Sequence, residues 1–200
     1  MKFFRIHALF IIFLALGCKS TKVSTVEFKN VSALNPDQSV NVIIEIPTGT
    51  TAKYELNKKT YVLEIDSVNG QPRHIEYLGY PGNYGMIPKT ISSKQLGGDG
   101  DPLDVLILGP SKKKGSVQKV RIIGVLELLD NGEQDDKLIA VLPESHWGKV
   151  QTIEELDQYY PGSKTIIATF FENYKGKGQM KLIRWSGRSK ALQILQNSLN

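Results

Sequence analysis

The 200-residue chain has almost no cysteine, few aromatic residues and no marked excess of one charge. Cys18 is its only cysteine, so no disulfide can form within the chain and the fold must rely on a hydrophobic core. The formal net charge of +5 is small and evenly spread, and it does not by itself argue for nucleic-acid binding. Hydrophobic residues make up 40% of the chain, a value typical of an ordinary soluble globular protein.

A long apolar run is also missing. Residues 8–16 are apolar, but a membrane-spanning helix needs about 20 such residues. Lys2 and Arg5 precede the run, a pattern typical of an export signal. The residues at its end, Ala15-Leu16-Gly17-Cys18, resemble the bacterial lipobox, in which the cysteine becomes the lipidated first residue. We therefore expect residues 1–17 to be a signal peptide and Cys18 to carry lipid. The alternative is a buried or membrane-skimming helix with an incidental cysteine.

The remainder divides into a polar segment and a domain. Residues 19–38 are rich in Ser, Thr, Lys and Asn with little periodicity, so we predict that residues 18–39 comprise the lipidated cysteine and a flexible tether. One domain is expected over residues 40–200. Its strand-like segments are Val40–Ile46 and residues 53–56, 61–65, 103–108, 117–129 and 138–142. Short strands at this spacing favour a closed or nearly closed barrel.

Helices are expected only in the last third of the chain. Thr152 and Glu155 have the spacing of a capping box, which predicts that a helix begins there. Farther along, apolar side chains recur every four residues and predict one helix face: Ile166, Phe170 and Tyr174. Ser186 is a candidate N-cap for a last helix. The predicted architecture is a β-barrel with helices packed on it.

The acidic loop, residues 99–104, contains the first candidate functional residues. Asp99, Asp101 and Asp104 lie in a segment broken by Gly and Pro that leads directly into an apolar strand. That strand is expected to bury Asp104, and a lone buried carboxylate is unfavourable unless a positive charge compensates it. A hard cation with oxygen ligands fits three nearby aspartates, although a turn stabilised by aspartates explains them about equally well. An EF-hand calcium loop is excluded, because its sixth position requires Gly and Asp104 occupies it.

Two further groups of polar residues are less specific. Asp130, Asp135 and Asp136, with Lys137 beside them, form an acidic cluster at the end of a predicted hairpin, where a solvated turn is the simpler interpretation. A third group contains cations and phenols able to donate hydrogen bonds to phosphate oxygens. Its members are Arg73, Tyr84, Tyr174, Lys175 and Lys53, the last of which shares a strand face with Glu55.

Taken in order, these segments closely resemble the soluble (family I) inorganic pyrophosphatases. The resemblance extends from about Val40 to Lys175 and rests most strongly on Asp-Gly-Asp-Pro-Leu-Asp-Val in the acidic loop. The other matching segments are Ile44-Glu45-Ile46-Pro47, Lys53-Tyr54-Glu55, Tyr80-Pro81-Gly82-Asn83-Tyr84-Gly85, residues 130–137 and Phe171-Glu172-Asn173-Tyr174-Lys175. The resemblance implies an α+β, mainly β fold: an OB-like closed five-stranded barrel with helices packed on it.

The resemblance also implies roles for individual residues. Asp99, Asp104 and Asp135 would hold a first metal, with Asp104 shared by a second, and Asp130 and Glu45 would contact further metals. Asp101 matches the general base. The residues expected to hold substrate phosphates are Lys53, Arg73, Tyr84, Tyr174 and Lys175, with Lys137 nearby and Glu55 beside Lys53. Arg73 follows a segment, residues 67–72, whose length and content differ from the usual family link.

The expected activity is Mg²⁺-dependent hydrolysis of inorganic pyrophosphate to two phosphates, with two or more metal ions per site. Pyrophosphate is the expected partner; nucleic acid is not, and contact with the membrane is expected only through the lipid on Cys18. The expected location is the bacterial cell envelope, although relatives in this family are usually cytosolic, and the resemblance implies a homo-oligomer. Two alternatives remain open at this point: a non-enzymatic OB-like barrel that binds nucleic acid, and another two-metal phosphohydrolase.

Overall fold

The computed structural model describes residues 27–199, so Cys18 and the predicted signal peptide lie outside the described residues. The first segment contains η1 (Phe28–Asn30) and then runs to β1 (Val40–Ile46). Ala33 is 6% exposed and packs in the core, and the Asn35 side chain donates a hydrogen bond to Asn41. Ala33 and Asn35, which lie within the predicted tether, therefore pack against the domain.

Five strands form a closed ring: β1, β6 (Asn83–Met86), β7 (Asp104–Leu108), β10 (Lys137–Val141) and β8 (Val117–Asp130). Each strand pairs with the next in this order, and β1 closes the ring by pairing with the first half of β8. Only β7 and β10 are parallel neighbours. The predicted five-stranded barrel is confirmed, and β6 is a ring strand outside the strand-like segments identified from the sequence.

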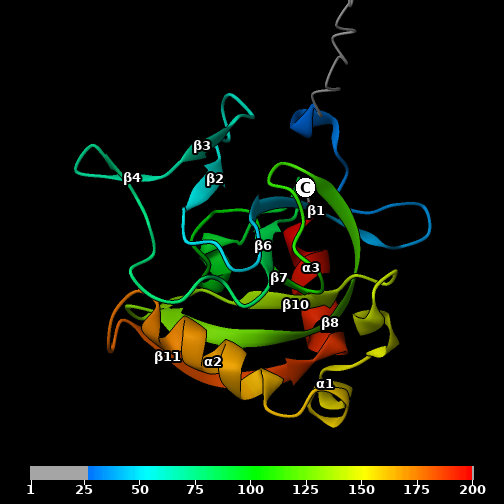
Figure 1. Cartoon of the computed structure of the whole chain (residues 1–200). Helices are drawn as coiled ribbons and strands as arrows, with labels where there is room; N and C mark the ends of the chain where they lie inside the picture. Colours follow the sequence, from blue (N-terminus) through cyan, green and yellow to red (C-terminus); the bar gives the residue numbers. More distant parts are fainter. Residues whose placement is uncertain (1–26, 200) are drawn as a thin grey trace, which may run out of the picture.

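Two small hairpins project from the ring near one another (Figure 1). The first pairs β2 (Tyr54–Leu56) with β3 (Leu63–Ile65), and the second pairs β4 (Ser67–Val68) with β5 (Gln71–Pro72). Neither belongs to the barrel sheet. Two short elements close loops elsewhere: η2 (Lys94–Leu96) before the acidic loop and β9 (Glu133–Gln134), which pairs with the end of β8.

The last third of the chain contains η3 (His146–Lys149), α1 (Ile153–Tyr159), α2 (Ser163–Asn173), β11 (Met180–Gly187) and α3 (Arg188–Ser198). The Thr152 side chain caps α1 by accepting from the backbone N–H of Glu155, as the capping box predicts. β11 pairs with β8 and was not expected from the sequence. The prediction that Ser186 caps the last helix is wrong: Ser186 lies in β11 and its hydroxyl donates to Glu127.

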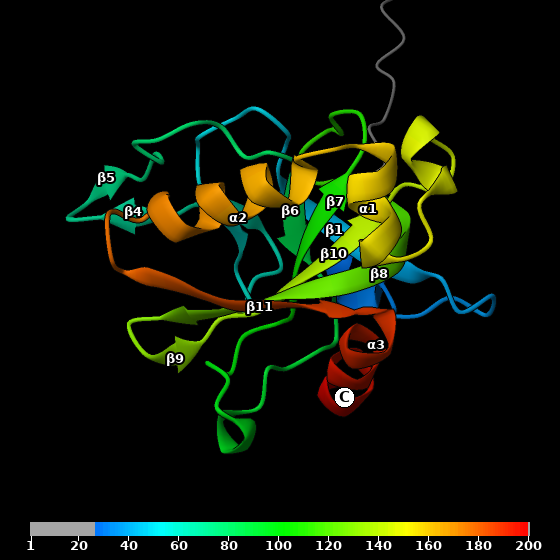
Figure 2. The same cartoon turned by 90° about the horizontal axis from the view of Figure 1, so that it is seen from below.

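Both faces of the central strands are buried, which explains their nearly continuous apolar sequences. On β7, Leu106 packs in a cluster with residues of α1 and α2, whereas Val105 packs in a second cluster with residues of α3. Successive strand residues point to opposite faces, so each face receives its own helices. In Figure 2, α1 and α2 lie on one side of β11 and α3 lies on the other. Within residues 27–199, no helix has the length and apolar content needed to span a bilayer.

Candidate active site

The acidic loop is shaped by its own carboxylates and glycines. An Asp99 carboxylate oxygen accepts a 2.8 Å hydrogen bond from the backbone N–H of Asp101, and Gly100 between them has a φ of +85°. Ser92 anchors the loop with two backbone hydrogen bonds. Its N–H donates to the Asp101 carbonyl at 2.7 Å, and its carbonyl accepts from the Gly100 N–H at 2.8 Å. Asp99 therefore does act as a turn former, while its other oxygen is not used in this turn.

Parallel pairing brings Asp104 and Lys137 together. Asp104 begins β7 and Lys137 begins β10, and the two residues are direct partners in the register of these strands. The Lys137 ammonium group lies 2.5 Å from oxygens of both Asp104 and Asp135, and its side chain is only 2% exposed. Burial by itself would lower the pKa of Lys137, but the carboxylates of Asp104 and Asp135 outweigh it and raise that pKa.

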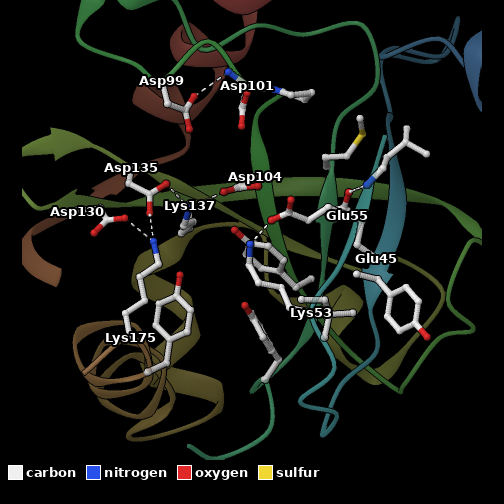
Figure 3. A pocket seen from close by; sticks show the side chains of 18 of the residues that line it. Glu45, Lys53, Glu55, Asp99, Asp101, Asp104, Asp130, Asp135, Lys137 and Lys175 are labelled. Carbon is white, nitrogen blue, oxygen red and sulfur yellow. Dashed lines mark hydrogen bonds and ion pairs between the residues drawn. The ribbon is translucent and has the colours of Figure 1, made fainter. Parts of the chain in front are cut away.

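The second acidic cluster meets the first through the same hairpin. Asp130 ends β8 and Asp135 follows β9, and Asp135 lies between Asp130 and Asp104 (Figure 3). Lys175, just after α2, pairs with Asp130 at 2.5 Å and lies 3.7 Å from Asp135. Burial alone would raise the pKa of Asp135, but Lys137 and Lys175 hold it below its usual value. Asp136 points elsewhere: its carboxylate accepts from the backbone N–H of Leu128.

Glu45 forms the floor of the site from β1. Its side chain is buried, and one oxygen accepts a 2.8 Å hydrogen bond from the backbone N–H of Leu56 in β2. Burial raises the pKa of Glu45 to about 8, with the nearby Asp104 carboxylate adding to the effect. The residue thus connects the barrel to the β2–β3 hairpin and presents a carboxyl group whose ionised form needs a compensating positive charge.

Cations and phenols complete the walls. Lys53 pairs with Glu55 and lies 3.5 Å from Asp66, which also accepts a 3.0 Å hydrogen bond from the Arg73 guanidinium group. On the barrel side, burial raises the pKa of Tyr84 well above 10 and also raises that of Tyr174. Both phenols therefore remain protonated and able to donate at neutral pH.

These side chains surround one cavity of about 290 Å³. Most of the polar residues that the sequence singled out line it: Glu45, Lys53, Glu55, Tyr84, Asp99, Asp101, Asp104, Asp130, Asp135, Lys137, Tyr174 and Lys175. Asp136 and Arg73 do not line it, and Arg73 reaches the site only through Asp66 and the backbone of Lys53. Carboxylates from several segments thus face phosphate-type donors across one opening (Figure 3).

Three lining or supporting residues were missed from the sequence. Tyr80 is 1% exposed, lines the cavity and packs against Tyr84 with a ring-centroid separation of 4.9 Å. Lys58, in the turn of the β2–β3 hairpin, lines the cavity and pairs with Asp101. Asp66 joins Lys53 to Arg73. The Tyr80 position lay within a segment already recognised, but no sequence pattern marked Lys58 or Asp66.

The donor set is compatible with a hard divalent cation. The candidate ligands are carboxylates, and the buried Glu45 favours a cation nearby. Among residues 27–199, no three acidic, histidine or cysteine side chains converge as a ready-made metal cage, and the ammonium groups of Lys137 and Lys175 lie between the carboxylates instead. Mg²⁺ does not require such a cage, since proteins commonly hold it with one or two carboxylates, waters and substrate phosphates.

Comparison with known proteins identifies the family. Residues 42–200 match the model of the inorganic pyrophosphatase family. The chain is 36% identical over 173 residues to an inorganic pyrophosphatase of Xanthomonas campestris, covering 84% of this chain and 92% of that protein. It is also 36% identical over 170 residues to the inorganic pyrophosphatase of Aquifex pyrophilus, covering 82% and 90%.

Comparison with solved structures points to the same family. The Helicobacter pylori inorganic pyrophosphatase superposes with a TM-score of 0.72 at 30% identity, covering 85% of this chain and 96% of that chain. A truncated vacuolar soluble pyrophosphatase of Trypanosoma cruzi, solved in complex with PPi, superposes with a TM-score of 0.77 at 27% identity, covering 84% and 70%. Together with the barrel fold and the residues that line the cavity, these matches establish that the chain belongs to the family I inorganic pyrophosphatases, hydrolases that act on pyrophosphate.

Proposed function

We propose that the chain hydrolyses pyrophosphate with Mg²⁺ held by the carboxylates of this cavity and with Asp101 as the general base. The observation that carries the proposal is the meeting of two acidic segments, the acidic loop and the hairpin end at residues 130–135, with phosphate-type donors around one opening. The proposed metal ligands are Asp99, Asp104, Asp130, Asp135 and Glu45. When bound, Mg²⁺ would neutralise phosphate oxygens and make an attacking water more acidic.

Two observations support Asp101 as the proposed acceptor of that water's proton. Its carboxylate is about half exposed and pairs with the equally exposed Lys58, whereas Asp104 and Asp135 pair with the buried Lys137. The backbone of Asp101 is held by Asp99 and Ser92, so the side chain projects from a fixed point of the loop. As the water oxygen attacks one phosphorus, the bond to the bridging oxygen breaks, Asp101 takes one water proton, and two phosphates result.

The phosphate oxygens are proposed to be bound from two sides. Lys53 would approach from the residue before β2, and Tyr174 and Lys175 from just after α2, while Tyr84 would donate from β6. Lys137 lies beneath them and fixes two of the proposed metal ligands. Arg73 would reach the substrate by leaving Asp66, or act through Lys53. Charge-assisted hydrogen bonds of this kind stabilise the highly charged substrate and the charge that develops on its leaving phosphate.

Phosphate release from a panel of substrates tests this proposal. The purified protein with Mg²⁺ should release phosphate from pyrophosphate and release far less from a nucleoside triphosphate or a phosphate monoester. Chelation with EDTA should abolish the activity and Mg²⁺ should restore it. Equal rates on triphosphates would instead favour a broader two-metal phosphohydrolase, and activity that survives complete chelation would contradict the Mg²⁺ requirement.

Membrane anchoring and assembly are separate proposals. Lys2, Arg5 and the segment ending at Cys18 support export followed by lipid attachment, which would place the enzyme in the bacterial cell envelope; the alternative is the cytoplasm. The Cys18→Ala variant should leave the membrane fraction and appear in the soluble fraction. A wild-type protein that is already soluble and retains residue 1 would contradict anchoring. The homo-oligomer implied by resemblance is tested by light scattering of the purified protein.

A further inference from the structure

The ammonium group of Lys58 forms an ion pair with the Asp101 carboxylate across the mouth of the cavity. The two residues are 43 positions apart and come from different segments: Lys58 from the turn of the β2–β3 hairpin and Asp101 from the acidic loop. Both line the same cavity as Lys53 and Glu55, which belong to the same hairpin. Lys58 is therefore a cavity cation that none of the roles proposed above employs.

The hairpin turn holds Lys58 in place. An Asn57 side-chain oxygen accepts from the backbone N–H groups of Lys59 and Thr60 at 2.9 and 3.1 Å, which fixes the turn on either side of the Lys58 side chain. The Asn57 amide also donates to Glu64 at 3.1 Å. At the base of the hairpin, the backbone N–H of Leu56 is bound by Glu45 from the barrel floor. Local hydrogen bonds thus fix the backbone of the turn that carries Lys58, and the Lys58 side chain extends from this turn to Asp101.

This pair differs from the other lysine–aspartate pairs of the cavity in its exposure. The side chains of Lys58 and Asp101 are both 55% exposed, whereas that of Lys137 is 2% exposed and that of Lys175 is 18% exposed. An exposed ion pair contributes little to stability and exchanges easily, while a buried pair is lost only at a large free-energy cost. Lys137 is consequently a fixed part of the structure, and Lys58 is free to change partners.

We propose that Lys58 binds a phosphate oxygen of the substrate and leaves Asp101 when pyrophosphate enters. This inference rests on the proposed function. A pyrophosphate oxygen offers Lys58 a more highly charged partner than one carboxylate, in a cavity that already gathers Lys53 and Lys175. The exchange would also leave the Asp101 carboxylate without its cation at the moment when it must accept a proton. One lysine would then both bind the substrate and release the base.

A binding experiment on the full chain tests the exchange. Imidodiphosphate, in which nitrogen replaces the bridging oxygen, is titrated calorimetrically with saturating Mg²⁺ into wild type, Lys58→Ala, Asp101→Asn and the double variant. Lys58→Ala should weaken binding about tenfold, the usual scale for losing a hydrogen bond to a charged group. Asp101→Asn should tighten binding about two- to fivefold because no ion pair has to break. That gain should be clearly smaller when Lys58 is already absent.

Lys59→Ala is the matched control, since Lys59 is exposed on the same turn and does not line the cavity. It should leave binding unchanged, and Lys58→Arg should retain most of the wild-type affinity. Wild-type affinity in Lys58→Ala, equal weakening in Lys59→Ala, or an equal gain from Asp101→Asn with and without Lys58 would each overturn the exchange. A wild-type protein that binds imidodiphosphate but releases no phosphate from pyrophosphate would instead contradict the proposed function.

Discussion

Lys137 and Asp104 are direct partners in the parallel pair β10–β7, and their side chains form an ion pair of 2.5 Å. Asp135 shares the same ammonium group at 2.5 Å. The pKa of Lys137 is higher in the folded protein than in the unfolded chain. The charged ammonium group therefore stabilises the fold at every pH below the unfolded pKa, and this stabilisation is lost only as the pH rises through the folded pKa. The group therefore remains charged and stabilising throughout the neutral range.

Lys137→Met should remove this internal cation and leave two carboxylates facing each other. We expect a loss of about 3–5 kcal/mol in the free energy of unfolding without Mg²⁺, the usual effect of breaking a buried ion pair. Added Mg²⁺ should recover part of the loss by neutralising Asp104 and Asp135. Urea denaturation with and without Mg²⁺ measures both effects. Lys164→Met, which removes a surface pair with Asp157 at 3.7 Å, is the control and should lose less than about 1 kcal/mol; equal losses would refute the structural role of Lys137.

Glu45 should make the metal-free protein less stable as the pH rises. Its pKa is raised from 4.5 to about 8, so the folded state keeps a proton that the unfolded chain releases. The corresponding stabilisation is fully present below pH 4.5 and is lost as the pH rises toward about 8. Glu45→Gln should remove this dependence, gaining on the order of a few kcal/mol relative to wild type between pH 5 and pH 8 in EDTA. The exposed Glu144→Gln should show no such trend. A pH-independent difference between wild type and Glu45→Gln would contradict the raised pKa.

Asp66 should hold two phosphate-type cations in position. It lies 3.5 Å from Lys53 and 3.0 Å from Arg73, and these cations outweigh its burial and lower its pKa. We expect Asp66→Asn to raise the KM for pyrophosphate several-fold and to change kcat less, since the loss of a charged partner loosens substrate binding by about 1 kcal/mol. Steady-state kinetics measure the changes in KM and kcat separately. Glu76→Gln, at an exposed position outside the cavity lining, is the control; an unchanged KM in Asp66→Asn would remove Asp66 from the site.

Much of the barrel could be predicted because its strands carry local signals. The largely apolar segment 103–108 and the β-branched segment Val40–Ile46 both contain ring strands. β11 was missed because it is an edge strand: Leu182 and Trp185 are only partly buried, and an irregularity in the pairing between Leu182 and Arg184 interrupts any alternation with exposed residues. Its pairing with β8 is a tertiary effect that local propensity does not contain.

Some residues of the candidate site could likewise be predicted from the sequence, and others could not. Residues in contiguous motifs, such as the acidic loop, were identified together, and the barrel places them in one cavity. Lys58 was not identifiable, because its relation to Asp101 depends on how the β2–β3 hairpin folds over the loop. The burial of Lys137 was also hidden, since it follows from the parallel register with Asp104 and not from its acidic neighbours in the sequence.

Phosphate release by Asp101→Asn, measured beside its Mg²⁺ binding, tests the central claim most directly. The substitution keeps the shape of the side chain and the backbone turn formed with Asp99, while removing the proton acceptor. We expect Mg²⁺ to bind with nearly wild-type affinity and turnover of pyrophosphate to fall by about 10²–10⁴-fold. Asp157→Asn, on the surface of α1, should behave as wild type. Normal turnover by folded Asp101→Asn would contradict the assignment of Asp101 as the base.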